Sequence, residues 1–226
     1  FAREGIDAKY LMLEIPSIDD LMGTLDQHPE TRGFNVTIPY KQQVMPLLDA
    51  IDPEAAEVGA VNVVRVSKDA NGKRTLTGFN SDIFGFWESI KPLIKKDIHK
   101  KALILGTGGA SKAVLYMLRK NGIEPLFVSR SKREGIITYE EITPEVMNEY
   151  KVIVNCSPVG MHPHVDECPA IPYECVTPDH LAFDLVYNPD VTLFLQKAAE
   201  HGAATKNGLE MLHLQAIRAW EIWNKE

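Results

Sequence analysis

The feature that most constrains this chain is a regular alternation of short apolar strands with helical segments between residues 101 and 200. It starts with ALILG and SKAVLYMLRKNG, continues through PLFVSR, VIVNCS and LAFDLVY, and reaches a helical pattern at TLFLQKAAEHG. Parallel strands joined by helices give this alternation, because each crossover helix covers one face of the sheet. We therefore expect a Rossmann-type, doubly wound domain over residues 85–207.

Residues 1–84 show a mixed pattern that predicts a smaller α/β domain. AKYLMLEI predicts a strand ended by Pro16, with Ser17 as the cap of a following helix. GFNVTI predicts a second strand, and two alternating runs separated by Asn71-Gly72 predict a hairpin. The closing segment GLEMLHLQAIRAWEIW has apolar residues on more than one helical face, so residues 208–226 are expected to return to this first domain as a helix.

The composition narrows the class of partner. The 226 residues carry a net charge of -7, which argues against nucleic acid because such binding relies on an excess of Lys and Arg. No apolar run approaches the length that crosses a bilayer. The three cysteines include no CxxC pair, which indicates plain thiols in a reducing compartment. We expect a cytoplasmic protein with a small-molecule partner, without membrane attachment.

A glycine-rich turn follows the first strand of the repeating part. Gly106, Gly108 and Gly109 stand between that strand and a helix, where glycines permit a tight turn and close approach of a pyrophosphate to the helix start. Ser111 takes the third small position of the G-x-G-x-x-G pattern. A plain tight turn is the alternative interpretation, and the strand that follows favours the dinucleotide.

The end of the next strand indicates which dinucleotide is bound. NAD-binding proteins usually place an acidic residue there, whereas this chain has Ser129 and Arg130, with Lys132 and Arg133 close behind. A guanidinium pairs with a 2'-phosphate that a carboxylate would repel. The pattern favours NADP over NAD, and a solvated basic turn is the alternative.

Two charged residues suit carbonyl reduction. Lys41 follows the strand GFNVTI, and Asp82 follows a strand at the start of a helix. Reduction of a ketone by hydride needs a proton donor for the developing alkoxide, and an ammonium both donates the proton and stabilises the charge. Asp82 is expected to hold the lysine by a charge-assisted hydrogen bond across the cleft between the domains. The alternatives are a solvated surface lysine and a helix N-cap.

The segment HPHVDEC contains His162, His164, Asp166 and Cys168, all of which are possible metal ligands. Two prolines and the absence of supporting ligands favour a loop, and the proposed chemistry needs no metal.

Several segments resemble the shikimate/quinate dehydrogenase family. They are GFNVTIPYK, GAVN, GFNSD, GTGGASKAV, VNCSPVGM, DLVYNP and NGLEMLHLQA, and they span almost the whole chain in the family's order. The chain departs from the family in having Ser81 and Val63 where threonine is usual, and in lacking the family's N-terminal strand and S-x-S motif.

The resemblance implies reduction of 3-dehydroshikimate to shikimate by NADPH, a step toward aromatic amino acids. It implies Lys41 and Asp82 as the catalytic pair. It places Thr37, Asn62, Tyr187 and Gln215 on the substrate, and Gly106, Thr107, Gly108, Gly109, Ala110, Ser129, Arg130, Ser131, Leu185 and Gly208 on the cofactor.

Three other functions stay open at this point. A quinate/shikimate dehydrogenase with relaxed specificity would share these motifs. A non-catalytic NADPH-binding sensor is opposed by the presence of both Lys41 and Asp82. A methylenetetrahydrofolate dehydrogenase-like enzyme would need a larger cleft. The sequence leaves the choice between monomer and homodimer open.

Overall fold

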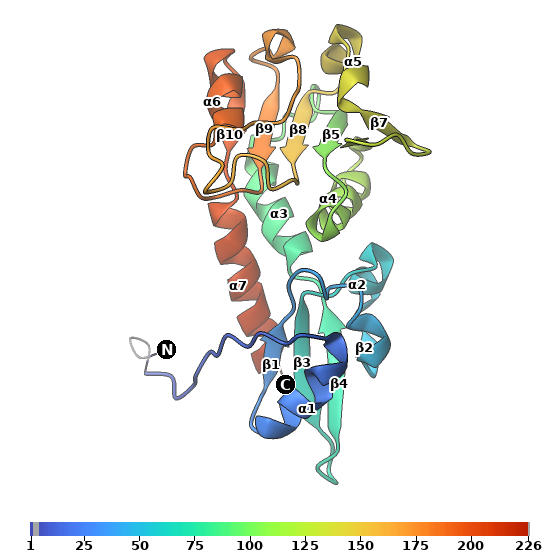
Figure 1. Cartoon of the computed structure of the whole chain (residues 1–226), viewed down its shortest axis with the longest axis vertical. Helices are drawn as coiled ribbons and strands as arrows, with labels where there is room; N and C mark the ends of the chain where they lie inside the picture. Colours follow the sequence, from blue (N-terminus) through green and yellow to red (C-terminus); the bar gives the residue numbers. More distant parts are fainter. Residues whose placement is uncertain (2–4, 226) are drawn as a thin grey trace.

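The computed structural model describes Phe1 and residues 5–225, and contains two separate β-sheets joined by two helices (Figure 1). Its helices are α1 (Leu21–Gln27), α2 (Pro53–Val58), α3 (Asp82–Ile90), α4 (Gly109–Lys120), α5 (Pro144–Glu149), α6 (Leu193–Glu200) and α7 (Leu209–Asn224). Its strands are β1 (Gly33–Asn35), β2 (Ala50–Ile51), β3 (Val63–Lys68), β4 (Arg74–Phe79), β5 (Lys101–Leu105), β6 (Glu124–Ser129), β7 (Ile136–Thr138), β8 (Val152–Asn155), β9 (Leu181–Asp184) and β10 (Ala204–Lys206). Short 3-10 turns lie at Ile18–Asp20, Met45–Leu47, Lys91–Leu93, Tyr139–Glu141 and Tyr173–Cys175.

The larger sheet has six strands in the order β10-β9-β8-β5-β6-β7, and every neighbouring pair is parallel. Successive side chains of a strand point to opposite faces, so the apolar run of β5 fills two cores. Ala102 and Ile104 pack with α3, α4 and α7, whereas Leu103 and Leu105 pack with α5 and α6. The expected Rossmann-type sheet, covered on both faces, is therefore confirmed.

The smaller sheet has four strands in the order β1-β3-β4-β2. β3 pairs antiparallel with β1 and β4, and β2 pairs parallel with β4. The predicted hairpin between β3 and β4 is confirmed: Gly72 has φ +78°, and the Asp69 carboxylate accepts the backbone N–H groups of Asn71 and Lys73. Helix α1 and the turn after β1 cover one face of this sheet through Leu21, Leu25 and Val44.

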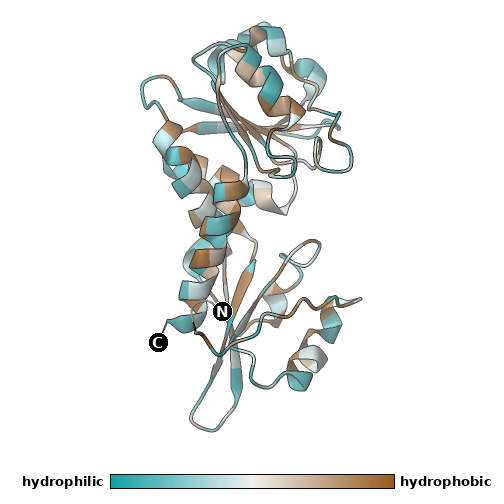
Figure 2. Cartoon of the chain, turned by 90° about the vertical axis from the view of Figure 1, so that its left-hand side faces the viewer, coloured by the Kyte–Doolittle hydropathy of each residue, from teal (hydrophilic) through white to brown (hydrophobic). Residues whose placement is uncertain are grey.

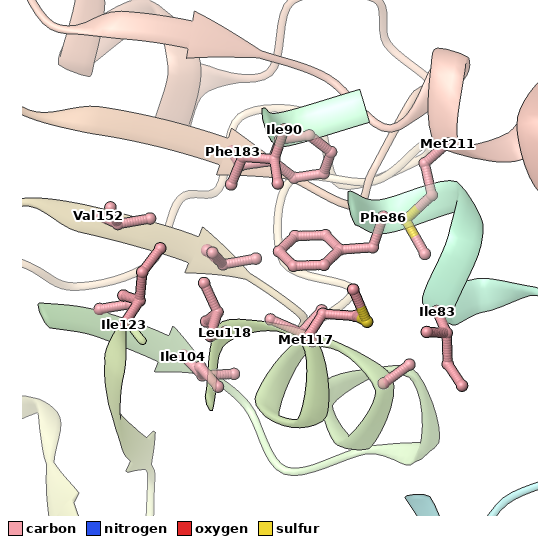
Figure 3. Packing of buried hydrophobic residues seen from close by; sticks show 14 of the residues in the cluster. Ile83, Phe86, Ile90, Ile104, Met117, Leu118, Ile123, Val152, Phe183 and Met211 are labelled. Carbon is pink, nitrogen blue, oxygen red and sulfur yellow. The ribbon is translucent and has the colours of Figure 1, made fainter. Parts of the chain in front are cut away.

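Helices α3 and α7 connect the two sheets. Figure 3 shows Ile83, Phe86 and Ile90 of α3 packed with Phe183 of β9 and Met211 of α7. The other half of α7 packs on the smaller sheet, where Ala219 and Ile222 contact Val63. Apolar residues alternate with polar ones around α7 in Figure 2, as a helix between two cores requires. The predicted return of the last helix to the first sheet is confirmed.

Two local predictions are wrong. Residues 8–15 form no strand, because they pair with no strand among the described residues; Leu11, Met12 and Leu13 are exposed. Asp82 is not the cap of α3: it is the first helical residue, Ser81 is the N-cap, and the Asn80 side chain accepts the Ile83 N–H instead.

Candidate active site

A cleft of about 500 Å³ lies where the turn after β1 meets the beginnings of α3, α4 and α7. Its volume is within the range of small-molecule sites. Its lining residues are Tyr10, Asn35, Val36, Thr37, Lys41, Asn62, Asp82, Ala110, Leu185, Tyr187, Gly208, Met211, Leu212, His213, Gln215 and Ala216. Residues of the smaller sheet and of loops and helices that adjoin the larger sheet therefore face one cavity.

Lys41 and Asp82 meet in this cleft. The Lys41 Nζ lies 2.7 Å from Asp82 Oδ2, and the two side chains are 15% and 5% exposed. The lysine backbone is fixed as well, because its carbonyl accepts the N–H of Val61 just before β3. Such a partly buried pair fixes the position of the ammonium at the wall of the cavity. The solvated-lysine alternative is therefore wrong for Lys41.

Asn62 connects this pair to the neighbouring helices. Its Nδ2 lies 2.9 Å from Asp82 Oδ1, 3.1 Å from Ser81 Oγ and 3.4 Å from Gln215 Oε1. Its Oδ1 accepts the Ser81 N–H at 2.7 Å. Because Asn62 and Asp82 are both buried, these bonds hold the carboxylate in one orientation.

The remaining residues predicted for substrate lie around the same cavity. Thr37 is exposed in the turn after β1, Gln215 lies on α7, and Tyr187, 45% exposed, lies in the loop after β9. The structure thus places hydroxyl, amide and phenol groups around one cavity, where they can hydrogen-bond to a polar small molecule.

The glycine turn lies beside Lys41. Gly106 has φ +101°, and an added Cβ would lie 3.3 Å from Ser157 atoms; at Gly109 an added Cβ would lie 3.8 Å from Lys41 Cδ. Gly108 is the N-cap of α4 without a side-chain cap, and an added Cβ there would meet nothing within 4 Å. The first-turn N–H groups and the open space fit a pyrophosphate. The Ser111 hydroxyl donates to the Gly108 carbonyl at 2.6 Å, which braces the turn.

The predicted 2'-phosphate residues lie apart from the cleft. Ser129 ends β6, and Arg130 and Ser131 are exposed in the turn after it, next to the strand that leads into the glycine turn. Lys132 pairs with Glu141, whereas Arg130 makes no ion pair with any described residue. The guanidinium is thus free to pair with an anionic group.

Leu185 and Gly208, which both line the cleft, contact each other. A Cβ at Gly208 would lie 2.2 Å from the Leu185 carbonyl oxygen, so only glycine fits this approach. The Gly208 N–H donates to the Val186 carbonyl at 3.2 Å. The beginning of α7 is therefore tied to the loop after β9.

Nine predicted residues line the cleft, and the others lie at the glycine turn or after β6. Sequence reasoning missed three polar residues that line the cleft, which are Asn35, Tyr10 and His213. The Asn35 Nδ2 donates to the Tyr10 hydroxyl at 2.8 Å. The alternation of GFNVT, which places Asn35 on the same side as Thr37, is the signal that indicates the first of them.

His162, His164, Asp166 and Cys168 lie in the exposed or half-exposed loop after β8. His164 lies 3.8 Å from Glu167. In the described part of the chain, no three His, Cys, Asp or Glu side chains are placed to hold a metal ion. No helix of that part is long and apolar enough to cross a membrane.

A parallel sheet with a glycine turn, next to a cleft that holds a lysine–carboxylate pair, defines a dinucleotide-dependent oxidoreductase. Comparison with known proteins makes this more specific. The sequence model of the shikimate dehydrogenase substrate binding domain matches residues 1–64. Shikimate dehydrogenase (NADP(+)) of Carboxydothermus hydrogenoformans is 39% identical over 206 residues, which is 85% of this chain and 72% of that protein.

Solved structures agree with the sequence comparison. Shikimate 5-dehydrogenase from Listeria monocytogenes in complex with shikimate and NAD has a TM-score of 0.86 at 29% identity, over 100% of this chain and 84% of the other. The Thermus thermophilus enzyme in complex with NADP(H) and shikimate has a TM-score of 0.76 at 32% identity. That match covers 93% of this chain and 80% of the other. The chain belongs to the shikimate dehydrogenase family.

Proposed function

We propose that this protein interconverts 3-dehydroshikimate and shikimate with NADP(H). The Lys41–Asp82 pair at the edge of the glycine turn is the observation that carries the proposal, because it sets a proton donor beside the place of a hydride-carrying cofactor. The bound nicotinamide supplies the hydride. Membership of a family whose curated relatives are named NADP-dependent shikimate dehydrogenases supports the choice of substrate and cofactor.

Lys41 supplies the proton. As a carbonyl carbon gains hydride, its oxygen gains negative charge, and the Lys41 ammonium stabilises that charge and then transfers a proton to it. Asp82 keeps the ammonium in place, and Asn62 fixes Asp82. Thr37, Tyr187 and Gln215 orient the substrate, and the first turn of α4 holds the pyrophosphate through Gly106 to Ala110.

Arg130, with Ser129 and Ser131, binds the 2'-phosphate, which separates NADP from NAD. Residues 1–84 with 208–226 form the substrate domain, and residues 85–207 form the cofactor domain. The protein acts in the cytoplasm as a monomer or homodimer.

The test is the growth of reduced-nicotinamide absorbance on the full-length protein, with shikimate or quinate and with NADP or NAD. Growth with shikimate and NADP is the expected result. Equal rates with quinate would replace the proposal by a relaxed quinate/shikimate dehydrogenase. Absence of turnover with all four combinations, while NADPH still binds, would replace it by an NADPH sensor.

A further inference from the structure

Asp184, the last residue of β9, is a fully buried carboxylate that the chemistry above does not use. Its Oδ2 accepts the Thr192 hydroxyl at 2.6 Å, and its Oδ1 accepts the Asn155 Nδ2 at 2.9 Å and the Val186 N–H at 3.0 Å. All three partners are donors. An ionised carboxylate, which only accepts hydrogen bonds, satisfies all of them.

Two of the three donors belong to segments that border the cleft or the glycine turn. Val186 lies between Leu185 and Tyr187, which line the cleft, and its carbonyl accepts the Gly208 N–H at the start of α7. The Asn155 Oδ1 accepts the N–H of Ser157 at 3.0 Å and its hydroxyl at 2.6 Å, and Ser157 contacts the turn at Gly106. Thr192 caps α6. One carboxylate therefore joins the ends of β8 and β9 to the start of α6.

No described cation pairs with Asp184. Burial raises the pKa of this carboxyl to about 6, and the three hydrogen bonds oppose that rise. Two other titratable groups interact with it electrostatically. Cys156, next to β8, and Tyr173 have pKa values that burial raises, so both are neutral near pH 6. Of these three titratable groups, the Asp184 carboxyl is thus the one that changes charge near pH 6.

We propose that Asp184 is a positioning residue for the reaction: its carboxylate holds the Leu185–Tyr187 wall, the start of α7 and the Ser157 support of the glycine turn in one arrangement. The expected effect of Asp184 on turnover rests on the proposed function. Its effect on the position of the cleft wall rests on the hydrogen bonds alone. A protonated carboxyl donates its own O–H, so either the Thr192 hydroxyl turns from donor to acceptor or the bond to Asn155 or Val186 is lost, and in both cases the wall shifts.

Kinetic assays test the consequence for turnover. Asp184→Asn keeps the shape but replaces one of the two accepting oxygens by an NH₂ group, so it cannot accept from both the Thr192 hydroxyl and the donors on Oδ1. We expect kcat/KM for shikimate at pH 8 to fall roughly 10- to 100-fold. The ratio of wild type to variant narrows as the pH falls below the pKa of about 6, because the wild-type carboxyl is then protonated as well. Exposed Asp166 provides a matched control, and Asp166→Asn is expected to leave kcat/KM unchanged.

An NMR titration tests the same cluster without turnover. In the wild type and in Asp166→Asn, the Val186 and Gly208 amide signals move together near pH 6, and in Asp184→Asn they do not. Thr192→Val removes one donor, so the pH midpoint of the amide shifts moves upward. Thr192→Ser keeps the hydroxyl, so the midpoint stays at its wild-type value.

The kinetic assay and the NMR titration distinguish failure of the proposed function from failure of the positioning role of Asp184. If the wild type does not oxidise shikimate but the amides titrate as described, the proposed function fails and the positioning of the wall stands. The positioning role of Asp184 is overturned if the Val186 and Gly208 amide signals do not shift between pH 5 and 7. It is also overturned if the ratio of kcat/KM between wild type and Asp184→Asn is the same at every pH.

Discussion

Lys41 is held at both its backbone and its side chain, and the two contacts come from distant parts of the chain. Its carbonyl accepts the Val61 N–H and its ammonium contacts Asp82. Their positions at strand ends and their opposite charges were sufficient to predict that they pair, but not to show how the chain brings them together. Their 2.7 Å contact follows from the meeting of β1, β3 and α3, and that arrangement is set by the tertiary fold.

Replacing Lys41 tests the role of the proton donor. We expect Lys41→Met to lower kcat at least about 100-fold, because the developing alkoxide loses both its proton and its counter-charge. Binding of NADPH, followed by nicotinamide fluorescence, changes little. Lys73→Met, in the exposed hairpin turn, is the matched control and keeps wild-type kcat. Turnover of Lys41→Met at the wild-type rate would contradict the assignment.

Replacing Arg130 tests the cofactor preference. Arg130→Ala is expected to raise the Kd of NADP by about tenfold, since a charge-assisted pair with the 2'-phosphate is lost, and to leave the Kd of NAD nearly unchanged. Isothermal titration with each cofactor measures this difference. Lys132→Ala removes a neighbouring cation that is already paired with Glu141, and serves as the control. An equal loss for both cofactors would refute the 2'-phosphate contact.

At the scale of the elements, α3 and α7 cross at a point where only glycine fits. A Cβ at Gly85 would lie 2.7 Å from the Met211 carbonyl oxygen and 3.2 Å from Gln215 atoms. The crossing fixes Gln215 relative to Asp82, because both helices carry residues of the cleft. Packing between backbones, and not helix propensity, decides this position.

Gly85→Ala is therefore expected to lower the free energy of unfolding by about 1–3 kcal/mol, since the two helices must move apart. Gly23→Ala in α1, where an added Cβ meets nothing within 4 Å, is the matched control and gains about 0.5–1 kcal/mol from helix propensity. Denaturant titration of both variants measures the contrast. Equal effects at the two glycines would show that the crossing tolerates a methyl group.

Long or strongly marked elements were predictable from the sequence, and short ones were not. The Asn71-Gly72 turn and the apolar runs of β5, β8 and β9 carry clear local signals. The three-residue strands β7 and β10 exist because they extend a sheet that is already formed, so they have no pattern of their own. Residues 8–15 show the converse, because an apolar run becomes a strand only where a partner strand lies beside it.

For the whole molecule, Asp184 makes stability depend on pH in an unusual direction. Burial raises the pKa of its carboxyl from 3.8 to about 6 in the folded state, so between these values the folded state binds more protons than the unfolded state. Stability from this group is then fully present below pH 3.8 and is lost as the pH rises through about 6. The loss is about 3 kcal/mol.

This pH dependence is measured as a difference. The free energy of unfolding of the wild type minus that of Asp184→Asn should fall by about 2 kcal/mol between pH 4 and pH 7. Carboxylates with lowered pKa values, such as Glu54 and Glu141, act in the opposite direction but cancel in the difference. A difference that is constant with pH would mean that Asp184 titrates normally in the folded protein.

The chain passes between the two sheets twice, once as it enters α3 and once along α7. Two connections between the sheets restrict their relative motion. They permit rotation of one sheet against the other about the line that joins the connections, and they resist translation and twisting. We therefore expect any opening of the cleft to follow one path, which would return Lys41 and the glycine turn to the same register. A cut through one connection alone would remove that restriction while leaving every side chain of the cleft in the molecule.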